Sequence, residues 1–153
     1  MTVSTSPDRH AERGRDDAWI RADEPGDAIA RTWLYIVGAA LLAAGLVGFV
    51  DNPIVSRSGD ALLQVDTLHS VAHLLTGLVA LFIGASQHGR ALAEATLAFG
   101  GVYLVVLGAT LVSPDLWGIF ATPVNPADHG LHFVGAAGSI GAGLVSTRAR
   151  LAA

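Results

Sequence analysis

Four long apolar runs, separated by short polar segments, dominate the pattern of the chain. They cover approximately residues 32–50, 68–86, 91–112 and 127–146; the uninterrupted apolar part of the fourth begins only at Gly130 and is rich in glycine. A helix needs about 20 apolar residues to cross a hydrocarbon layer about 30 Å thick, because lipid offers no hydrogen-bond partner to the backbone. All six prolines fall outside these runs. The pattern therefore predicts an all-α fold, a bundle of four transmembrane helices.

The segment before the first run has a different composition. Residues 1–31 hold seven of the 13 acidic residues and five of the nine arginines, although only 14% of the whole chain is charged. Soluble domains carry roughly 25% charged residues, so residues 32–153 have the composition of a membrane-embedded segment. The composition of residues 1–31 cannot bury enough apolar surface to fold. We expect a disordered cytoplasmic tail there, and a short cytoplasmic tail at residues 147–153.

The arginines predict the orientation, because positive residues near membrane spans stay on the cytoplasmic side. One arginine, Arg57, falls in a loop predicted to lie outside. The arginines predicted to lie inside are Arg21, Arg31, Arg90, Arg148 and Arg150. Both termini should therefore be cytoplasmic in a multi-pass protein of the cytoplasmic membrane. About thirty polar residues precede the first run, so we interpret it as a retained span and not as a signal peptide.

Several function classes are excluded by what the sequence lacks. It has no cysteine, hence no disulfide, thiolate metal site or cysteine nucleophile. It has no lysine and a formal net charge of −4, which argues against nucleic-acid binding. It has neither a nucleophile elbow nor a glycine-rich phosphate loop after a strand, so no catalytic residue is predicted. The expected partners are the lipid bilayer and either a second copy of the chain or another membrane protein.

Small residues recur at every fourth position within three of the spans. The stripes are Ala40, Ala44 and Gly48; Thr76, Ala80 and Gly84; and Gly135, Ser139 and Gly143. Such stripes let helix backbones approach closely in lipid. Since three spans carry one, packing within a compact bundle is favoured over dimerisation.

An internal repeat relates the segments that open the second and fourth spans. Residues 66–73 align with residues 125–132 without a gap, at an offset of 59 residues. The shared pattern is an aspartate or asparagine, then histidine or aspartate three residues later, then histidine four residues after that. Each unit contains two spans, so both copies would face the membrane in the same direction. A pseudo-twofold axis along the membrane normal is predicted.

These repeated motifs resemble a known family. The residues that carry the resemblance are His69-Ser-Val-Ala-His73-Leu-Leu-Thr-Gly77 and Asn125-Pro-Ala-Asp128-His-Gly-Leu-His132, with Gly45-Leu-Val-Gly48-Phe49 and Gly101-Val-Tyr103 in support. The chain resembles the small four-span prokaryotic membrane proteins grouped as domain of unknown function 4383, over approximately residues 32–146. Where such proteins usually have Asn-Pro before the first histidine motif, this chain has Asp66-Thr67. The resemblance implies no activity.

Two interpretations of the repeated polar residues remain open. In the first, Asp66 and Asn125 cap helices, Pro126 opens the fourth helix, and the histidines form hydrogen bonds with an acid that join two spans. In the second, the i, i+4 pairs His69/His73 and Asp128/His132 hold zinc, copper, iron or a haem, or mark a path for protons or cations.

The sequence favours the first interpretation. It predicts a small structural or interaction protein that contains no cofactor and catalyses no reaction. The alternative is a metal- or haem-binding redox or transport component that uses His69, His73, Asp128 and His132.

Overall fold

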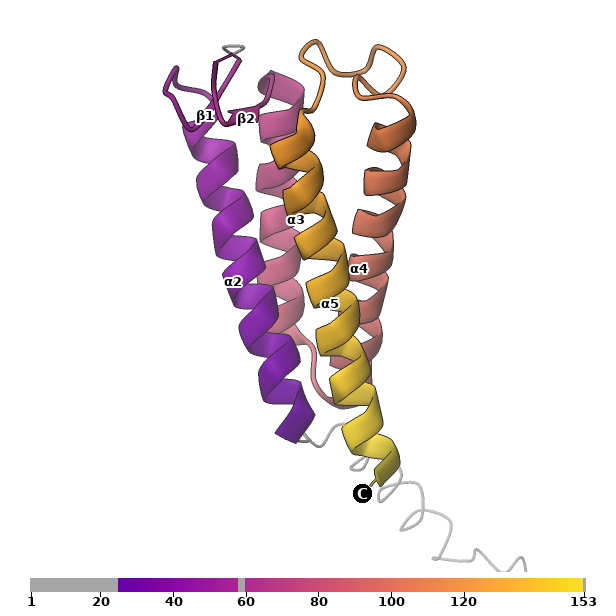
Figure 1. Ribbon diagram of the computed structural model, residues 1–153. Coiled ribbons are helices and arrows are strands. Elements are labelled where there is room, and N and C mark those ends of the chain that lie inside the picture. The colour runs from indigo at the N-terminus through magenta and orange to yellow at the C-terminus, as the bar shows by residue number, and fades with distance from the viewer. Residues whose placement is uncertain (1–24, 58–59, 153) are drawn as a thin grey trace, which may run out of the picture.

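The computed structural model describes residues 25–57 and 60–152, and this part of the chain is mostly helical (Figure 1). Its helices are α2 (Pro25–Val47), α3 (Thr67–Ser86), α4 (Gly89–Val112) and α5 (Pro126–Ala152). Residues 48–66 and 113–125 connect helices at one end of the bundle, which we call the loop end. At the other end, the terminus end, α2 begins, α5 ends and a short turn joins α3 to α4 (Figure 1).

The helices do not pack equally on one another. The most extensive contacts are between α4 and α5 and between α2 and α3, followed by those between α2 and α5. In contrast, α3 and α4 touch little, although only two residues separate them in the chain. The bundle is therefore least tightly closed between α3 and α4.

The distribution of polar and apolar side chains is the reverse of that in a soluble protein. Thr96, Ser139 and Ser146 are fully buried, whereas Phe82 and Val105 are 66% and 71% exposed. Three helices, α2, α3 and α4, are long and apolar enough to cross a membrane. A surface of large apolar side chains is suited to contact with lipid and not with water. The chain is thus a membrane protein.

A close approach of two glycines brings α2 and α3 together. A methyl group at Gly38 would lie 3.0 Å from the carbonyl oxygen of Gly77, and one at Gly77 would lie 2.9 Å from that of Gly38. Both distances are shorter than van der Waals contact, so a side chain at either position would force the helices apart. Neither glycine belongs to the small-residue stripes noted in the sequence.

The three stripes lie largely inside the bundle. Gly48, Gly84 and Gly135 are buried against neighbouring helices or loops, where an added methyl group would meet Ser70, Tyr35 and Tyr103, respectively. This supports packing within the bundle. Ala40 is the exception, because it is exposed.

The helices extend further at the terminus end than the sequence pattern predicts. Helix α2 begins at Pro25 and not at Thr32, and α5 continues to Ala152 instead of ending at Ser146. Both extensions are held together: Arg150 and Ser146 donate to the Asp27 carboxylate, which is 1% exposed. The hydropathy pattern excluded these polar residues from the spans, because it does not show that their side chains form hydrogen bonds with one another. The rest of the expected tail, residues 1–24, lies outside the described residues.

Two smaller elements complete the fold. At the loop end, β1 (Val55–Ser56) and β2 (Leu63–Gln64) pair in parallel, with Val55 opposite Leu63. The sequence pattern did not predict these two-residue strands. At the terminus end, the Arg90 Nε atom lies 2.7 Å from Glu94 Oε1 on the surface of α4.

Candidate metal centre

The first turns of α3 and α5 are fixed by side-chain caps. Asp66 Oδ1 accepts a hydrogen bond from the His69 N–H at 2.8 Å. Asn125 Oδ1 accepts from the N–H groups of Ala127 and Asp128 at 2.9 and 3.0 Å. These bonds satisfy backbone donors that have no partner within the helix. The capping roles predicted for Asp66 and Asn125 are confirmed.

The same capping residues also join the two connecting segments. Asp66 Oδ2 accepts from the N–H groups of Ala121 and Thr122, and Asn125 Nδ2 donates to the carbonyl of Leu62 at 2.9 Å. Each helix start is therefore tied to the segment that precedes the other helix.

The same N–H donors lower the pKa of Asp66. Burial alone would raise this pKa, but the N–H groups of His69, Thr122 and Ala121 outweigh burial and hold the pKa below its ordinary value of 3.8.

Three imidazole rings meet beneath these caps. His69 and His73 point inward from α3, His132 points inward from α5, and they are 2%, 8% and 5% exposed. The ring centroids are 4.4 Å apart for His69 and His73, 5.9 Å for His69 and His132, and 6.3 Å for His73 and His132. One ring nitrogen of each histidine lies within 4.8 Å of the others. We call these three residues the histidine cluster.

The Nδ1 atoms of all three histidines are buried, and no described residue forms a hydrogen bond with any of them. The His69 ring does bond to the backbone of Gln64, which leaves Nδ1 as its unbonded nitrogen. A buried polar atom without a partner costs roughly 1–3 kcal/mol, so three within one cluster call for an explanation. Coordination of a metal ion is one use for such unpaired ring nitrogens, and one ring nitrogen of each histidine lies within 4.8 Å of the others.

The donor set suits a single metal ion. Imidazole binds zinc, copper, iron and nickel, with zinc–nitrogen bonds of about 2.0–2.1 Å. Tetrahedral coordination at that length separates the nitrogens by about 3.4 Å. The nitrogens of the cluster lie within 4.8 Å, so modest ring rotations would bring them to this separation. The His69 ring lies close to the rings of both His73 and His132. A haem held between His73 and His132 would have to pass through the space that the His69 ring occupies.

Asp128, the fourth residue predicted for the site, is held differently. Its Oδ2 atom accepts hydrogen bonds from the N–H groups of Gln64 at 3.2 Å and Asn125 at 2.9 Å. It is buried, but it does not belong to the group of closely spaced ligand atoms formed by the three histidines. The structure therefore brings together three of the four predicted residues and places Asp128 beside them.

Two aromatic residues, Phe120 and Tyr103, border the histidine cluster. The sequence did not assign either of them to this site. Phe120 stacks on His69 with centroids 4.8 Å apart and planes inclined by 12°. Tyr103 meets His132 edge to face at 6.1 Å, and its hydroxyl donates to Thr76 Oγ1 at 3.2 Å. A tyrosine in the middle of an apolar span was the available signal, because a buried phenol hydroxyl needs a partner.

The histidine cluster lies between two small cavities. One, of about 250 Å³, lies between α2 and α5, and the other, of about 220 Å³, lies between α3 and α4. We call them the α2–α5 cavity and the α3–α4 cavity. His73, Tyr103 and His132 line both. Trp33 also lines the α2–α5 cavity, and its Nε1 atom donates to Ser139 Oγ at 2.8 Å.

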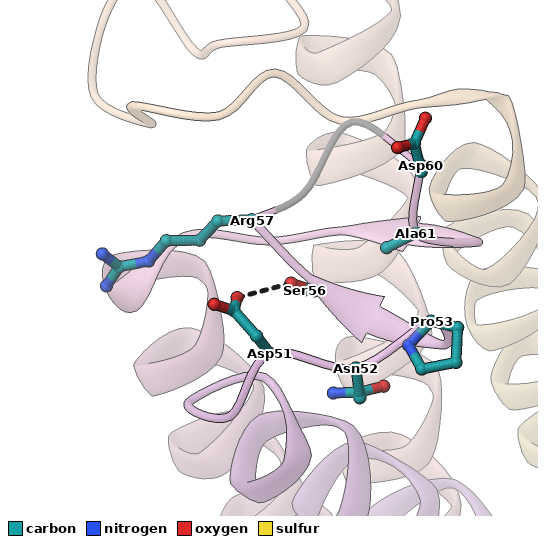
Figure 2. A pocket seen from close by; sticks show the side chains of 7 residues that line it. All are labelled: Asp51, Asn52, Pro53, Ser56, Arg57, Asp60 and Ala61. Carbon is teal, nitrogen blue, oxygen red and sulfur yellow. Dashed lines mark hydrogen bonds between the residues drawn. The ribbon is translucent and has the colours of Figure 1, made fainter.

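A third hollow, of about 690 Å³, lies in the connection between α2 and α3 (Figure 2). Its lining includes Asp51, Asn52 and Asp60, and Asp51 accepts a hydrogen bond from Ser56 Oγ at 2.9 Å. Figure 2 shows Arg57 extending away from these residues. The hollow shares no lining residue with the histidine cluster, and its polar groups are mostly exposed.

Comparison with known proteins gives one match. A family model described as Domain of unknown function (DUF4383) matches residues 31–145. No curated protein and no solved structure matches the chain. The matched range contains all three histidines of the cluster and all the residues that line the α2–α5 cavity.

Proposed function

The chain belongs to the DUF4383 family, whose description states no activity, and we propose from its own geometry that it binds a transition-metal ion within the membrane. The ligands are His69, His73 and His132. The observation that carries this proposal is the set of three buried Nδ1 atoms that no described residue satisfies.

The hydrogen-bonded interpretation of the cluster has less support. It requires an imidazole to bond with another imidazole or with Asp128. Neither bond occurs among the described residues; Asp128 Oδ2 accepts from backbone N–H groups instead. A metal ion explains why three imidazoles converge without bonding one another.

Three histidines leave one coordination position open on a tetrahedral ion. Metal sites of this kind bind water or a substrate at the fourth position, whereas structural sites are closed by four protein ligands. The α2–α5 cavity borders His73 and His132 and offers space for such a ligand. We therefore propose a functional site and not a purely structural one, for zinc, copper(II) or ferrous iron.

The membrane setting we propose is that of a four-span protein of the prokaryotic cytoplasmic membrane. Helix α5 has 27 residues and packs along both α2 and α4, which supports its role as the fourth span. Arg90, Arg148 and Arg150 lie toward the terminus end, whereas Arg57 lies at the loop end. This distribution favours a cytoplasmic terminus end and an external histidine cluster.

A pseudo-twofold repeat is also supported. Asp66 bonds to Ala121 while Asn125 bonds to Leu62, and the offset of 59 residues converts one pair of positions into the other. Contacts between symmetric copies have this reciprocal form. His73 and His132 are equivalent under the same offset, so the metal would lie near the axis.

The test is metal binding by the purified chain. After removal of metal by a chelator, wild type should take up one equivalent of Zn²⁺ and unfold at a higher temperature, because binding stabilises only the folded state. His73→Ala and His132→Ala should lose both effects. His88→Ala, which removes an exposed histidine at the terminus end, should keep them.

Two results would contradict the proposed metal site. A wild-type protein that holds no metal, and whose stability responds to neither Zn²⁺, Cu²⁺, Fe²⁺ nor a chelator, would refute the proposal. Loss of binding in His88→Ala but not in His73→Ala would move the site away from the cluster.

A further inference from the structure

The α2–α5 cavity has a polar end and an apolar end. His73, Asp128 and His132 lie at the end near the loops, and Trp33 lies deeper in the bundle. The Trp33 ring is held in place, because its Nε1 atom donates to Ser139 and the ring lies directly against Gly138. The rest of the lining is mainly aliphatic, with Val37 and Leu41 on the α2 side. The cavity is therefore an apolar chamber with its polar groups at one end.

The apolar part of the cavity lies next to the lipid-facing surface. Among its lining residues, Ile36, Leu131 and Val134 are 59%, 51% and 53% exposed. These residues belong to the outward faces of α2 and α5, which carry other exposed apolar side chains. A molecule that enters the cavity on this side would come from the bilayer. This favours an occupant that dissolves in lipid.

The polar end determines which chemical group would fit. Asp128 Oδ2 is used by two backbone donors, whereas no described residue donates to Oδ1. An occupant that arrives through lipid does not carry a charged carboxylate or phosphate at low cost, and a pure hydrocarbon would offer neither a donor to Asp128 nor a ligand to the metal. A hydroxyl group offers its hydrogen to Asp128 and a lone pair to a metal held by the histidines.

We infer that the α2–α5 cavity takes a membrane-dissolved molecule with a slim apolar body and a terminal hydroxyl group, which occupies the open position of the metal. This inference rests on the proposed metal site. The cavity volume of about 250 Å³ lies just below the usual range of ligand pockets, about 300–1,000 Å³. It suits a substituted ring or a short chain and is too small for a whole phospholipid.

The experiment uses the full chain in detergent, loaded with Co²⁺ so that the metal can be observed by its visible absorption. The probe is 4-propylphenol, and propylbenzene is the matched compound without the hydroxyl group. The phenol should shift the Co²⁺ bands with a saturable dependence on concentration, and propylbenzene should not shift them.

Two alanines of α2 provide a matched pair of variants. Ala40 lines the cavity, whereas Ala39 does not, and both are exposed. Ala40→Phe should weaken the effect of the phenol at least tenfold while Co²⁺ binding stays unchanged. Ala39→Phe should behave as wild type.

The outcomes separate this inference from the proposed function. If Co²⁺ binds through the histidines but the phenol leaves its spectrum unchanged, the inference is overturned and the metal site stands. Equal responses of Ala40→Phe and Ala39→Phe would also overturn it, since the phenol would then act elsewhere. Failure of Co²⁺ to bind would overturn both.

Discussion

Single polar side chains make several essential connections at both ends of this bundle. Asp66 caps α3 and also binds the segment before α5. At the other end, Asp27 receives both Arg150 and Ser146 from α5. Each carboxylate thus joins parts of the chain that are far apart in sequence, so its charge state and partners should affect the stability of the whole bundle.

The Asp66 carboxylate makes stability depend on pH. Its pKa is lower in the folded protein than the ordinary 3.8, so its contribution is present above pH 3.8 and is lost as the pH falls through the folded value. In metal-free protein, Asp66→Asn should be less stable than wild type by about 1–2 kcal/mol at pH 7. The difference should shrink below pH 4, as measured by thermal unfolding in detergent. A difference that stays constant from pH 7 to pH 3 would contradict this account.

The Asp27–Arg150 pair should be costly to break. The two side chains are 1% and 8% exposed, so Arg150→Met would remove a buried ionic partner of the Asp27 carboxylate. Such changes cost about 3–5 kcal/mol. The Asp27→Asn/Arg150→Met double variant should recover part of that loss in unfolding measurements.

The control for the buried pair is Arg90→Met. Its partner is Glu94 and the two side chains are 64% and 60% exposed, so the change should cost less than about 0.5 kcal/mol. Equal losses for Arg150→Met and Arg90→Met would show that burial of Asp27 contributes nothing.

At the scale of helices, the position of each glycine determines what a larger residue would do. Gly38 and Gly77 lie where α2 and α3 touch, whereas an added methyl group at Gly101 or Gly108 of α4 would meet no atom within 4 Å. The same substitution should therefore have opposite effects at these two kinds of position.

Alanine substitutions test this difference directly. Gly38→Ala and Gly77→Ala should destabilise the protein by about 1–3 kcal/mol, because the helices must separate. Gly101→Ala and Gly108→Ala should be neutral or stabilising by up to about 1 kcal/mol, because alanine favours the helix. Thermal unfolding of the four variants would measure both signs. Destabilisation at Gly101 and Gly108 equal to that at Gly38 and Gly77 would contradict the packing described for α2 and α3.

How far the elements follow from the sequence depends on how local their causes are. The apolar runs and the caps at Asp66 and Asn125 are local patterns, and the structure has a helix over each run and confirms both caps. The extensions of α2 and α5 were missed because Asp27 and Arg150, 123 residues apart, stabilise each other only once the bundle has formed. The spacing of the histidines indicated which residues meet. It could not indicate that Asp128 would bind backbone groups of Gln64 and Asn125.

At the scale of the whole molecule, the polar groups are gathered inside and the apolar surface faces outward. Helix α5 lies between α2 and α4, and this place in the bundle, more than its own composition, supports the proposal of a fourth span. If all four helices cross the membrane, the terminus end and the loop end face different compartments. This arrangement can be tested directly, since the chain has no native cysteine.

Single cysteines at three positions test the proposed orientation. Asp60→Cys lies at the loop end and should react with an impermeant thiol reagent added to intact cells. His88→Cys and Arg148→Cys lie at the terminus end and should react only after the membrane is opened. Reaction of Arg148→Cys but not His88→Cys in intact cells would show that α5 is not a span. The reverse labelling of all three positions would invert the proposed orientation.

The modest apolar character of α5 has a consequence for how the protein is made. Helices α2, α3 and α4 can each enter the bilayer on the strength of their own hydropathy, and they emerge from the ribosome first. Helix α5 carries Asp128, His129 and His132 in its first two turns, so its insertion should depend on the surfaces that α2 and α4 already offer. His132 would then be the last ligand to arrive. A nascent chain could then not capture the proposed ion before α5 has been made and inserted, and metal loading would report that the four helices have assembled.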